Sequence, residues 1–320
     1  TAMGTSVGTI TLITPIAIPI AAASGYSLPL CIASVMGGAM FGDNLSFISD
    51  TTIAACNGQG CAMKDKFREN FKIALPAALA SLAIILVLSF NANITGAVIH
   101  EYELIELIPY LIVLVGGIIG INVFIVLLLG ILSGAIIMVA TGATAAIDLL
   151  TSMGTGAAGM FETTMVAILV SAICALIREY GGFVWLLNAI KSTFKNRKGG
   201  QLGMGILVGC MDIATANNTV AIVMANPIAA DMAKTYNISR RKTASILDTF
   251  SCVFQGIIPY GAQMLIAIAT TASAGYAITA FQIIPCLFYP FMLFISSLVF
   301  IFLIPDHREY DGDDTEATEA

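Results

Sequence analysis

Long apolar segments, separated by short polar ones, run through nearly the whole chain. Of its 320 residues, 58% are hydrophobic and only 11% are charged, and the mean hydropathy is +0.92. Because soluble domains carry about 25% charged residues, this composition excludes an ordinary soluble fold. It predicts an all-α polytopic membrane protein whose main partner is the lipid bilayer. No basic patch with interleaved aromatic residues indicates binding to nucleic acid.

One of the apolar segments is interrupted by polar side chains. Residues 42–52, GDNLSFISDTT, contain two carboxylates, two serines, an asparagine and two threonines, with apolar residues on both sides. Membrane transporters bind ions at such interruptions, because unwound backbone and helix ends can coordinate an ion away from lipid. A polar surface loop between two helices is the alternative interpretation.

Two parts of the chain repeat a pattern of polar and apolar residues. Residues 3–17, MGTSVGTITLITPIA, align with residues 215–229, TANNTVAIVMANPIA. After a shift of one residue in the alignment register, residues 41–54 align with residues 254–267. Identities are few, but the polar clusters of each pair coincide. The pattern therefore indicates an internal repeat.

The basic residues indicate how the repeat lies in the membrane. We treat residues 5–24 and 201–233 as parts of re-entrant hairpins, which return to the side they entered. Each of the remaining spans, broken segments included, is taken to cross the membrane once. All 14 Lys and Arg then fall on one side, in loops 61–72, 177–200 and 234–242 and in the C-terminal tail. Because basic loops mark the cytoplasm, we expect a cell-membrane protein whose basic loops and C-terminus are cytoplasmic. The two hairpins enter from opposite faces, which predicts an inverted-repeat secondary transporter with re-entrant hairpins and broken helices.

The string GDNLSFISDTT, together with ANNTVAIVMANPIA and GIIPYGAQ, resembles the NhaC-type sodium/proton antiporter family of the ion transporter superfamily. The resemblance extends to about Pro305. It implies an elevator-like or rocking carrier, with two hairpin tips and two broken helices around a midplane site. It also implies that the aspartates of the first string carry the ion and the proton. Related dicarboxylate transporters have a similar Ser-Asn-Thr hairpin tip.

The repeat and the resemblance divide the chain into four predicted parts. These are the C-terminal part of the first inverted repeat (1–90), an extracytoplasmic loop (91–106), the second inverted repeat (107–305) and an acidic cytoplasmic tail (306–320). The second repeat has about 110 residues before its tip at Asn217, whereas the first has four before Thr5. We therefore expect an N-terminally incomplete chain that works with missing N-terminal helices of the same transporter. A homodimer is left open.

Asp43 and Asp50 are the predicted Na⁺ ligands and coupling groups. Burial favours the protonated carboxyl and a bound Na⁺ favours the charged form, so ion and proton compete for one group. We expect Asp50 to be the more desolvated of the two and to carry the proton, and Asp43 to be the more hydrogen-bonded.

Neutral oxygens and two further acids complete the predicted site. The first string supplies Asn44, Ser46, Ser49 and Thr51, and the hairpin tips supply Thr5, Ser6, Asn217, Asn218 and Thr219. As helix N-caps alone, the tip residues would look similar. Gln263 is a further ligand candidate. Asp212 is either a second titrating group or a helix cap, and Asp248 is expected to be buried.

These residues favour a Na⁺/H⁺ antiporter with no cofactor beyond the two transported ions. A Na⁺- or H⁺-coupled antiporter of organic anions, such as malate or lactate, is the alternative within the same family. No Lys or Arg falls inside a predicted span, so we expect the site to lack the cation that an anion would need. A membrane enzyme is not expected, because the only histidines, His100 and His307, lie in predicted loops and no nucleophile–base pair is visible. A purely structural fragment is the remaining class.

Overall fold

The computed structural model describes residues 4–90, 105, 108–119, 123–151, 153–154, 179–304 and 310, with single positions between 165 and 176. These residues form helices and turns, without a strand. The chain divides into two compact units, one of residues 3–98 with 181–320 and the other of residues 99–180. The predicted all-α architecture is confirmed for the described part.

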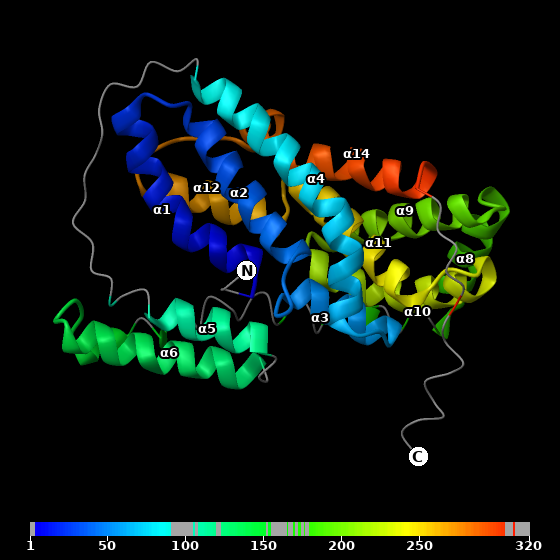
Figure 1. Cartoon of the computed structure of the whole chain (residues 1–320), viewed down its shortest axis with the longest axis horizontal. Helices are drawn as coiled ribbons and strands as arrows, with labels where there is room; N and C mark the ends of the chain where they lie inside the picture. The colour runs from blue at the N-terminus through cyan, green and yellow to red at the C-terminus, as the bar shows by residue number, and fades with distance from the viewer. Residues whose placement is uncertain are drawn as a thin grey trace. The chain divides into compact units, whose positions relative to one another are not determined.

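The larger unit contains most of the helices. They are α1 (Ser6–Ser24), α2 (Leu28–Asn44), α3 (Asp50–Gln59), α4 (Met63–Phe90), α8 (Gly182–Thr193), α9 (Arg197–Thr215), α10 (Asn218–Tyr236), α11 (Arg240–Ile257), α12 (Ala262–Ser273), α13 (Ala280–Ile283), the 3₁₀ turn η2 (Ile284–Cys286) and α14 (Phe288–Phe302). Helix α1 packs against α2 and α12, and α10 packs against α3, α9 and α11 (Figure 1). Helix α4 packs against α11 and α14.

Two helices are interrupted where the sequence predicts broken helices. Residues 45–49 separate α2 from α3, and residues 258–261 separate α11 from α12. In the first break, Ser46 accepts a 3.1 Å hydrogen bond from the backbone N–H of Ile48. The breaks expose backbone groups that the helices on either side leave unbonded.

The predicted second hairpin is formed by α9 and α10. Helix α9 ends at Thr215 and is followed by its C-cap Ala216, whose φ of 55° lies in the left-handed region; Asn217 is then the N-cap of α10, which begins at Asn218. The glycines of α9 admit the aromatic rings of α11, since a Cβ at Gly205 would lie 2.6 Å from Phe250 and one at Gly209 would meet Phe254. Small residues allow this close helix packing within membranes.

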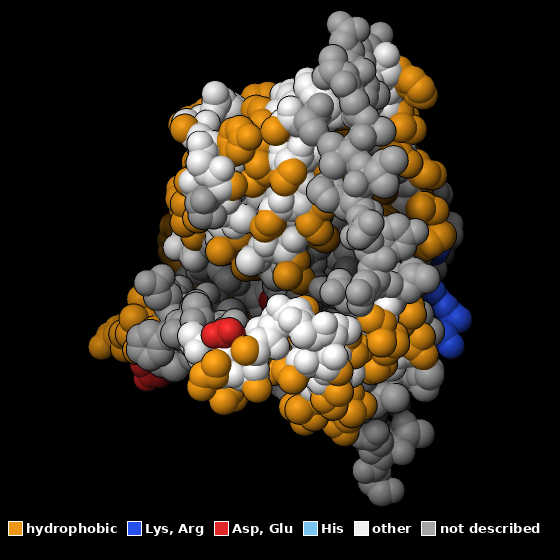
Figure 2. Space-filling view, turned by 90° about the vertical axis from the view of Figure 1, so that its left-hand side faces the viewer, with side chains coloured by type: hydrophobic (Ala, Val, Ile, Leu, Met, Phe, Trp, Pro, Cys, Tyr) orange, Lys and Arg blue, Asp and Glu red, His pale blue; other side chains and the backbone are white. Residues whose placement is uncertain are grey.

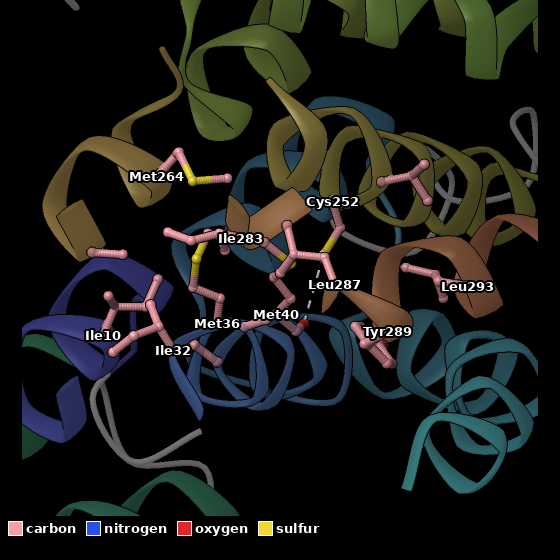
Figure 3. Packing of buried hydrophobic residues seen from close by; sticks show 14 of the residues in the cluster. Ile10, Ile32, Met36, Met40, Cys252, Met264, Ile283, Leu287, Tyr289 and Leu293 are labelled. Carbon is pink, nitrogen blue, oxygen red and sulfur yellow. Dashed lines mark hydrogen bonds between the residues drawn. The ribbon is translucent and has the colours of Figure 1, made fainter. Parts of the chain in front are cut away.

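The core of the larger unit joins elements that are far apart in the sequence. Met36 and Met40 of α2 lie beside Met264 of α12 and Leu287, which precedes α14 (Figure 3). Figure 3 also marks the 3.8 Å contact from the Cys252 thiol of α11 to the backbone oxygen of Met40. This packing fixes both broken helices against α1 and α14, close to the first break.

The smaller unit contains the predicted spans 107–121 and 123–141, which the structure gives as α5 (Ile108–Ile119) and α6 (Val123–Ala140). These two helices pack against one another. Most of the predicted span 162–178, of the predicted loop 91–106 and of the predicted tail 306–320 lies outside the described residues. The predicted roles of these segments stay predictions.

Among the described residues, Met63–Phe90 and Arg240–Ala272 are long and apolar enough to cross a membrane. A third crossing is possible by length if Ala280–Cys286 and Phe288–Phe302, bent by 50°, form one span. Helix α4 exposes large apolar side chains, including Leu79, Leu82 and Val87. Hydrophobic side chains are also spread over the face in Figure 2. An apolar exterior of this kind suits lipid contact.

Candidate ion-binding site

Asp43 lies at the end of α2 with only 3% of its surface exposed. The Ser49 hydroxyl donates a 3.0 Å hydrogen bond to Asp43 Oδ1 and lies 2.9 Å from the hydroxyl of Thr51. Ser6, at the start of α1, is a further hydroxyl beside this carboxyl group. Asp43 Oδ2 is buried and has no hydrogen-bond partner among the described residues. The first break thus presents one open carboxylate oxygen to a shell of hydroxyls.

Asp50 begins α3, and its carboxyl group is fully engaged. Oδ1 accepts a 2.9 Å hydrogen bond from the backbone N–H of Thr51, and Oδ2 accepts one of 2.8 Å from the hydroxyl of Thr219. Asp50 is exposed, whereas Asp43 is buried. The expectation that Asp50 is the more desolvated of the pair is therefore wrong. The reason is its position on the first turn of a helix that faces a hairpin tip.

Each break is bonded through its backbone to a predicted hairpin tip. The N–H of Asp50 donates a 3.1 Å hydrogen bond to the oxygen of Gly4, just before α1. The N–H of Ala262, the first residue of α12, donates one of the same length to Ala216, between α9 and α10. The two bonds join corresponding places, the start of a second half-helix and the residue before a tip.

Side-chain hydrogen bonds connect each predicted tip with the break of the other predicted repeat. Thr219 of the second tip bonds Asp50 of the first break, and Gln263 of the second break donates a 2.6 Å hydrogen bond to Ser6 of the first tip. Gln255, near the end of α11, donates a 3.0 Å hydrogen bond to the backbone oxygen of Ala216. The structure therefore brings both tips and both breaks into one region.

The remaining tip residues have local roles. Asn217 caps α10 by accepting a 3.1 Å hydrogen bond from the N–H of Val220, as the N-cap interpretation predicts. Asn218 accepts one of 3.0 Å from the N–H of Thr219. Thr5 occupies the N-cap position of α1 without a side-chain cap bond.

Asp248 on α11 is buried as predicted and has an unexpected partner. The ammonium of Lys66 lies 2.7 Å from Asp248 Oδ2, with both side chains 0% exposed. The same oxygen accepts hydrogen bonds from Asn44, at 2.9 Å, and from Asn70, at 2.6 Å. The expectation that no cation lies inside a span is therefore wrong. The charged run 61–72 is largely the first turns of α4, and Asp248 compensates the charge of the buried lysine.

Asp212 on α9 is fully buried, and neither of its carboxyl oxygens has a hydrogen-bond partner in the described part of the chain. A charged carboxylate in such a position is costly. Its surroundings suit a neutral acid or one that holds a cation. Its side chain therefore caps no helix among the described residues, and its role as a second titrating group stays a prediction.

Two further buried oxygens around the breaks, Gln255 Oε1 and Gln263 Oε1, have no hydrogen-bond partner in the part of the chain that the structure describes, as is also true of Asp43 Oδ2. No group of three or more His, Cys, Asp or Glu in the described ranges is placed to hold a metal ion. A cation at this place would therefore rely on one or two carboxylates and on neutral oxygens, which is how transporters bind Na⁺ beside unwound helices.

Interrupted helices around a buried carboxyl group are typical of helical membrane carriers. The model of the Na⁺/H⁺ antiporter family matches residues 1–91 and 90–304, and the chain belongs to this family. This membership confirms the resemblance seen in the sequence.

Similarity to individual proteins is more limited. An uncharacterized protein of Haemophilus influenzae is 35% identical over 107 residues, which are 33% of this chain and 21% of that protein. The match therefore spans about a fifth of the relative's length. No solved structure matches the chain.

Proposed function

We propose that the protein exchanges Na⁺ for H⁺ across the cell membrane, at the first break and the two hairpin tips. The observation that carries this proposal is the buried, unpartnered Asp43 Oδ2 beside the hydroxyl of Ser49. A buried carboxylate oxygen without a hydrogen-bond partner needs either a proton or a cation. The two transported ions of an antiporter meet that need in turn.

Asp43 is the group that alternates between the two ions. A Na⁺ bound to Oδ2 would compensate the charge of the carboxylate, and the hydroxyls of Ser6, Ser49 and Thr51 can turn their oxygens toward it. When a proton replaces the Na⁺, the carboxyl group becomes neutral and needs no counter-ion. The two states exclude one another because both use the same oxygen.

Asp50 supports this exchange from the exposed side. Its carboxylate is close enough to Asp43 to interact electrostatically. It also holds Thr219 of the second hairpin tip at 2.8 Å. Asp50 therefore attracts the incoming cation and ties the tip to the first break.

The matching backbone bonds at the two tips support an inverted repeat. Gly4 accepts from Asp50, and Ala216 accepts from Ala262. In an inverted-repeat carrier, one tip opens the site to one face of the membrane and the other tip opens it to the opposite face. We propose that these two contacts break in turn as the site changes access.

Exchange of an organic anion is the alternative. Lys66 supplies a buried cation, but its ammonium is already paired with Asp248 at 2.7 Å. An anion would have to displace that carboxylate. The pairing therefore favours a cation as substrate.

The test is proton movement in vesicles that contain the protein expressed in full from its gene. A Na⁺ gradient should drive proton movement in the opposite direction without any organic anion. Internal malate should leave the rate unchanged. Proton movement that appears only when malate or lactate is present would assign the alternative function.

A further inference from the structure

The ammonium of Lys66 lies in a cradle of three oxygens from three separate segments. Its Nζ is 2.7 Å from Asp248 Oδ2 of α11, 2.6 Å from Thr52 Oγ1 of α3 and 3.4 Å from the backbone oxygen of Asn44 at the end of α2. Lys66 and Thr52 are both 0% exposed. One carboxylate, one hydroxyl and one backbone carbonyl form a ligand set that also suits a small monovalent cation.

The cradle is held in shape by groups other than the lysine. Asn70 donates hydrogen bonds of 2.6 Å to Asp248 Oδ2 and 2.9 Å to the backbone oxygen of Asn44. The side chain of Asn44 donates a 2.9 Å hydrogen bond to Asp248 Oδ2 and accepts one of 2.8 Å from the hydroxyl of Tyr289 on α14. Because these bonds orient two of the three oxygens without Lys66, the cradle should persist when the lysine side chain is shortened.

We propose that the Lys66 ammonium occupies a built-in monovalent cation site and serves there as a tethered cation. It neutralises Asp248 and binds the carbonyl end of α2 that follows Asp43. The role of Lys66 in transport rests on the proposed exchange at Asp43. With the lysine in place, Asp248 keeps the same counter-charge throughout, and only the carboxyl groups at the first break exchange ions. The cation site itself follows from the cradle alone.

The experiment measures thermal unfolding of the detergent-purified protein, expressed in full, in buffers whose only cation is a bulky organic one. Lys66→Ala removes the ammonium and leaves the three oxygens, so its Tm should fall well below that of the wild type. Ammonium or methylammonium should then restore most of the lost Tm with a saturable dependence on concentration. The wild type should not respond to either cation in the same range.

Two controls make the outcome decisive. The double variant K66A/D248N lacks the carboxylate, so its Tm should not respond to ammonium or methylammonium. The variant K66M/D248N removes both charges and fills part of the space, and it should fold without added cation.

A Lys66→Ala protein whose Tm does not respond to ammonium or methylammonium would overturn the proposal. So would its failure to fold in the presence of these cations while K66M/D248N folds. Neither result depends on transport, so the proposal can fail while Na⁺/H⁺ exchange at Asp43 stands.

Discussion

The hydroxyl of Thr219, on the first turn of α10, donates a 2.8 Å hydrogen bond to Asp50 Oδ2, on the first turn of α3. The two residues lie 169 positions apart in the chain. The contact joins the second predicted hairpin tip to the first break, so the candidate ion site draws on both predicted repeats.

Thr219→Val keeps the shape of the side chain and removes this hydrogen bond. A hydrogen bond to a charged group contributes about 1.5–3 kcal/mol. If Na⁺ binding requires the contact between the tip and Asp50, losing this free energy should raise the KM for Na⁺ by about tenfold or more. Thr219→Ser keeps the hydroxyl and should stay near the wild-type KM. Equal KM values for Thr219→Val and Thr219→Ser would show that the contact has no part in ion binding.

The packing of α3 on α10 gives a prediction on stability. A Cβ at Gly58 would collide with the side chain of Asn226, which donates a 3.0 Å hydrogen bond to the oxygen of Ala54 and accepts one of 2.9 Å from Gln59. Gly58→Ala should therefore lower the free energy of unfolding by about 1–3 kcal/mol, read as a lower Tm in detergent.

Gly38 is the matched control for this substitution. It also lies within a helix, but a Cβ there would meet nothing within 4 Å. Gly38→Ala should leave Tm unchanged or raise it, because alanine favours the helix. A smaller loss of Tm for Gly58→Ala than for Gly38→Ala would contradict the described packing of α3 on α10.

The predicted sidedness can be measured by cysteine labelling in intact cells, in a background without the native cysteines. Single cysteines at Lys64, Lys195 and Arg240 should react only after the membrane is made permeable. A cysteine at Glu103 should react from outside. Labelling of Arg240 and Lys64 from opposite sides would break the inverted-hairpin arrangement.

The hydroxyl of Tyr289 offers a test of how the end of α2 is fixed. Tyr289→Phe removes the 2.8 Å hydrogen bond to Asn44 Oδ1 and keeps the ring that packs against Phe41. Asn44 lies next to Asp43, so a looser helix end should lower Tm and weaken Na⁺ binding together. The expected loss of stability is about 1 kcal/mol. A lower Tm with an unchanged Na⁺ affinity would limit Tyr289 to a structural role.

Local sequence pattern was sufficient to locate the broken helices and the second tip. Polar residues between apolar runs marked the break that follows Asn44, and Asn217 marked the start of α10. Both signals are short-range, since a few adjacent residues decide where a helix ends and where its first N–H groups find partners.

The pairing of Lys66 with Asp248 could not be read in the same way. Lys66 belongs to a run of charges that is typical of a cytoplasmic loop, and its partner lies on α11, far along the chain. Only the packing of α4 against α11 brings the two charges together. The exposures of Asp43 and Asp50 were misjudged for the same reason, because the hairpin tips decide which carboxyl group water can reach.

Asp43 is the proposed site of Na⁺/H⁺ exchange, and the Asp43→Asn variant tests this role most directly. Asparagine keeps the size of the side chain and can still accept a hydrogen bond from Ser49, but it does not titrate. The Asp50→Asn variant is the matched control, and both variants should retain a Tm close to that of the wild type.

In vesicles with the protein expressed in full, Asp43→Asn should abolish proton release driven by Na⁺ at every pH. Asp50→Asn should weaken Na⁺ affinity and still show exchange that depends on pH. If Asp43→Asn exchanges Na⁺ for H⁺ with an unshifted pH profile, Asp43 is not the coupling group, and the buried, unpartnered Asp212 becomes the next candidate.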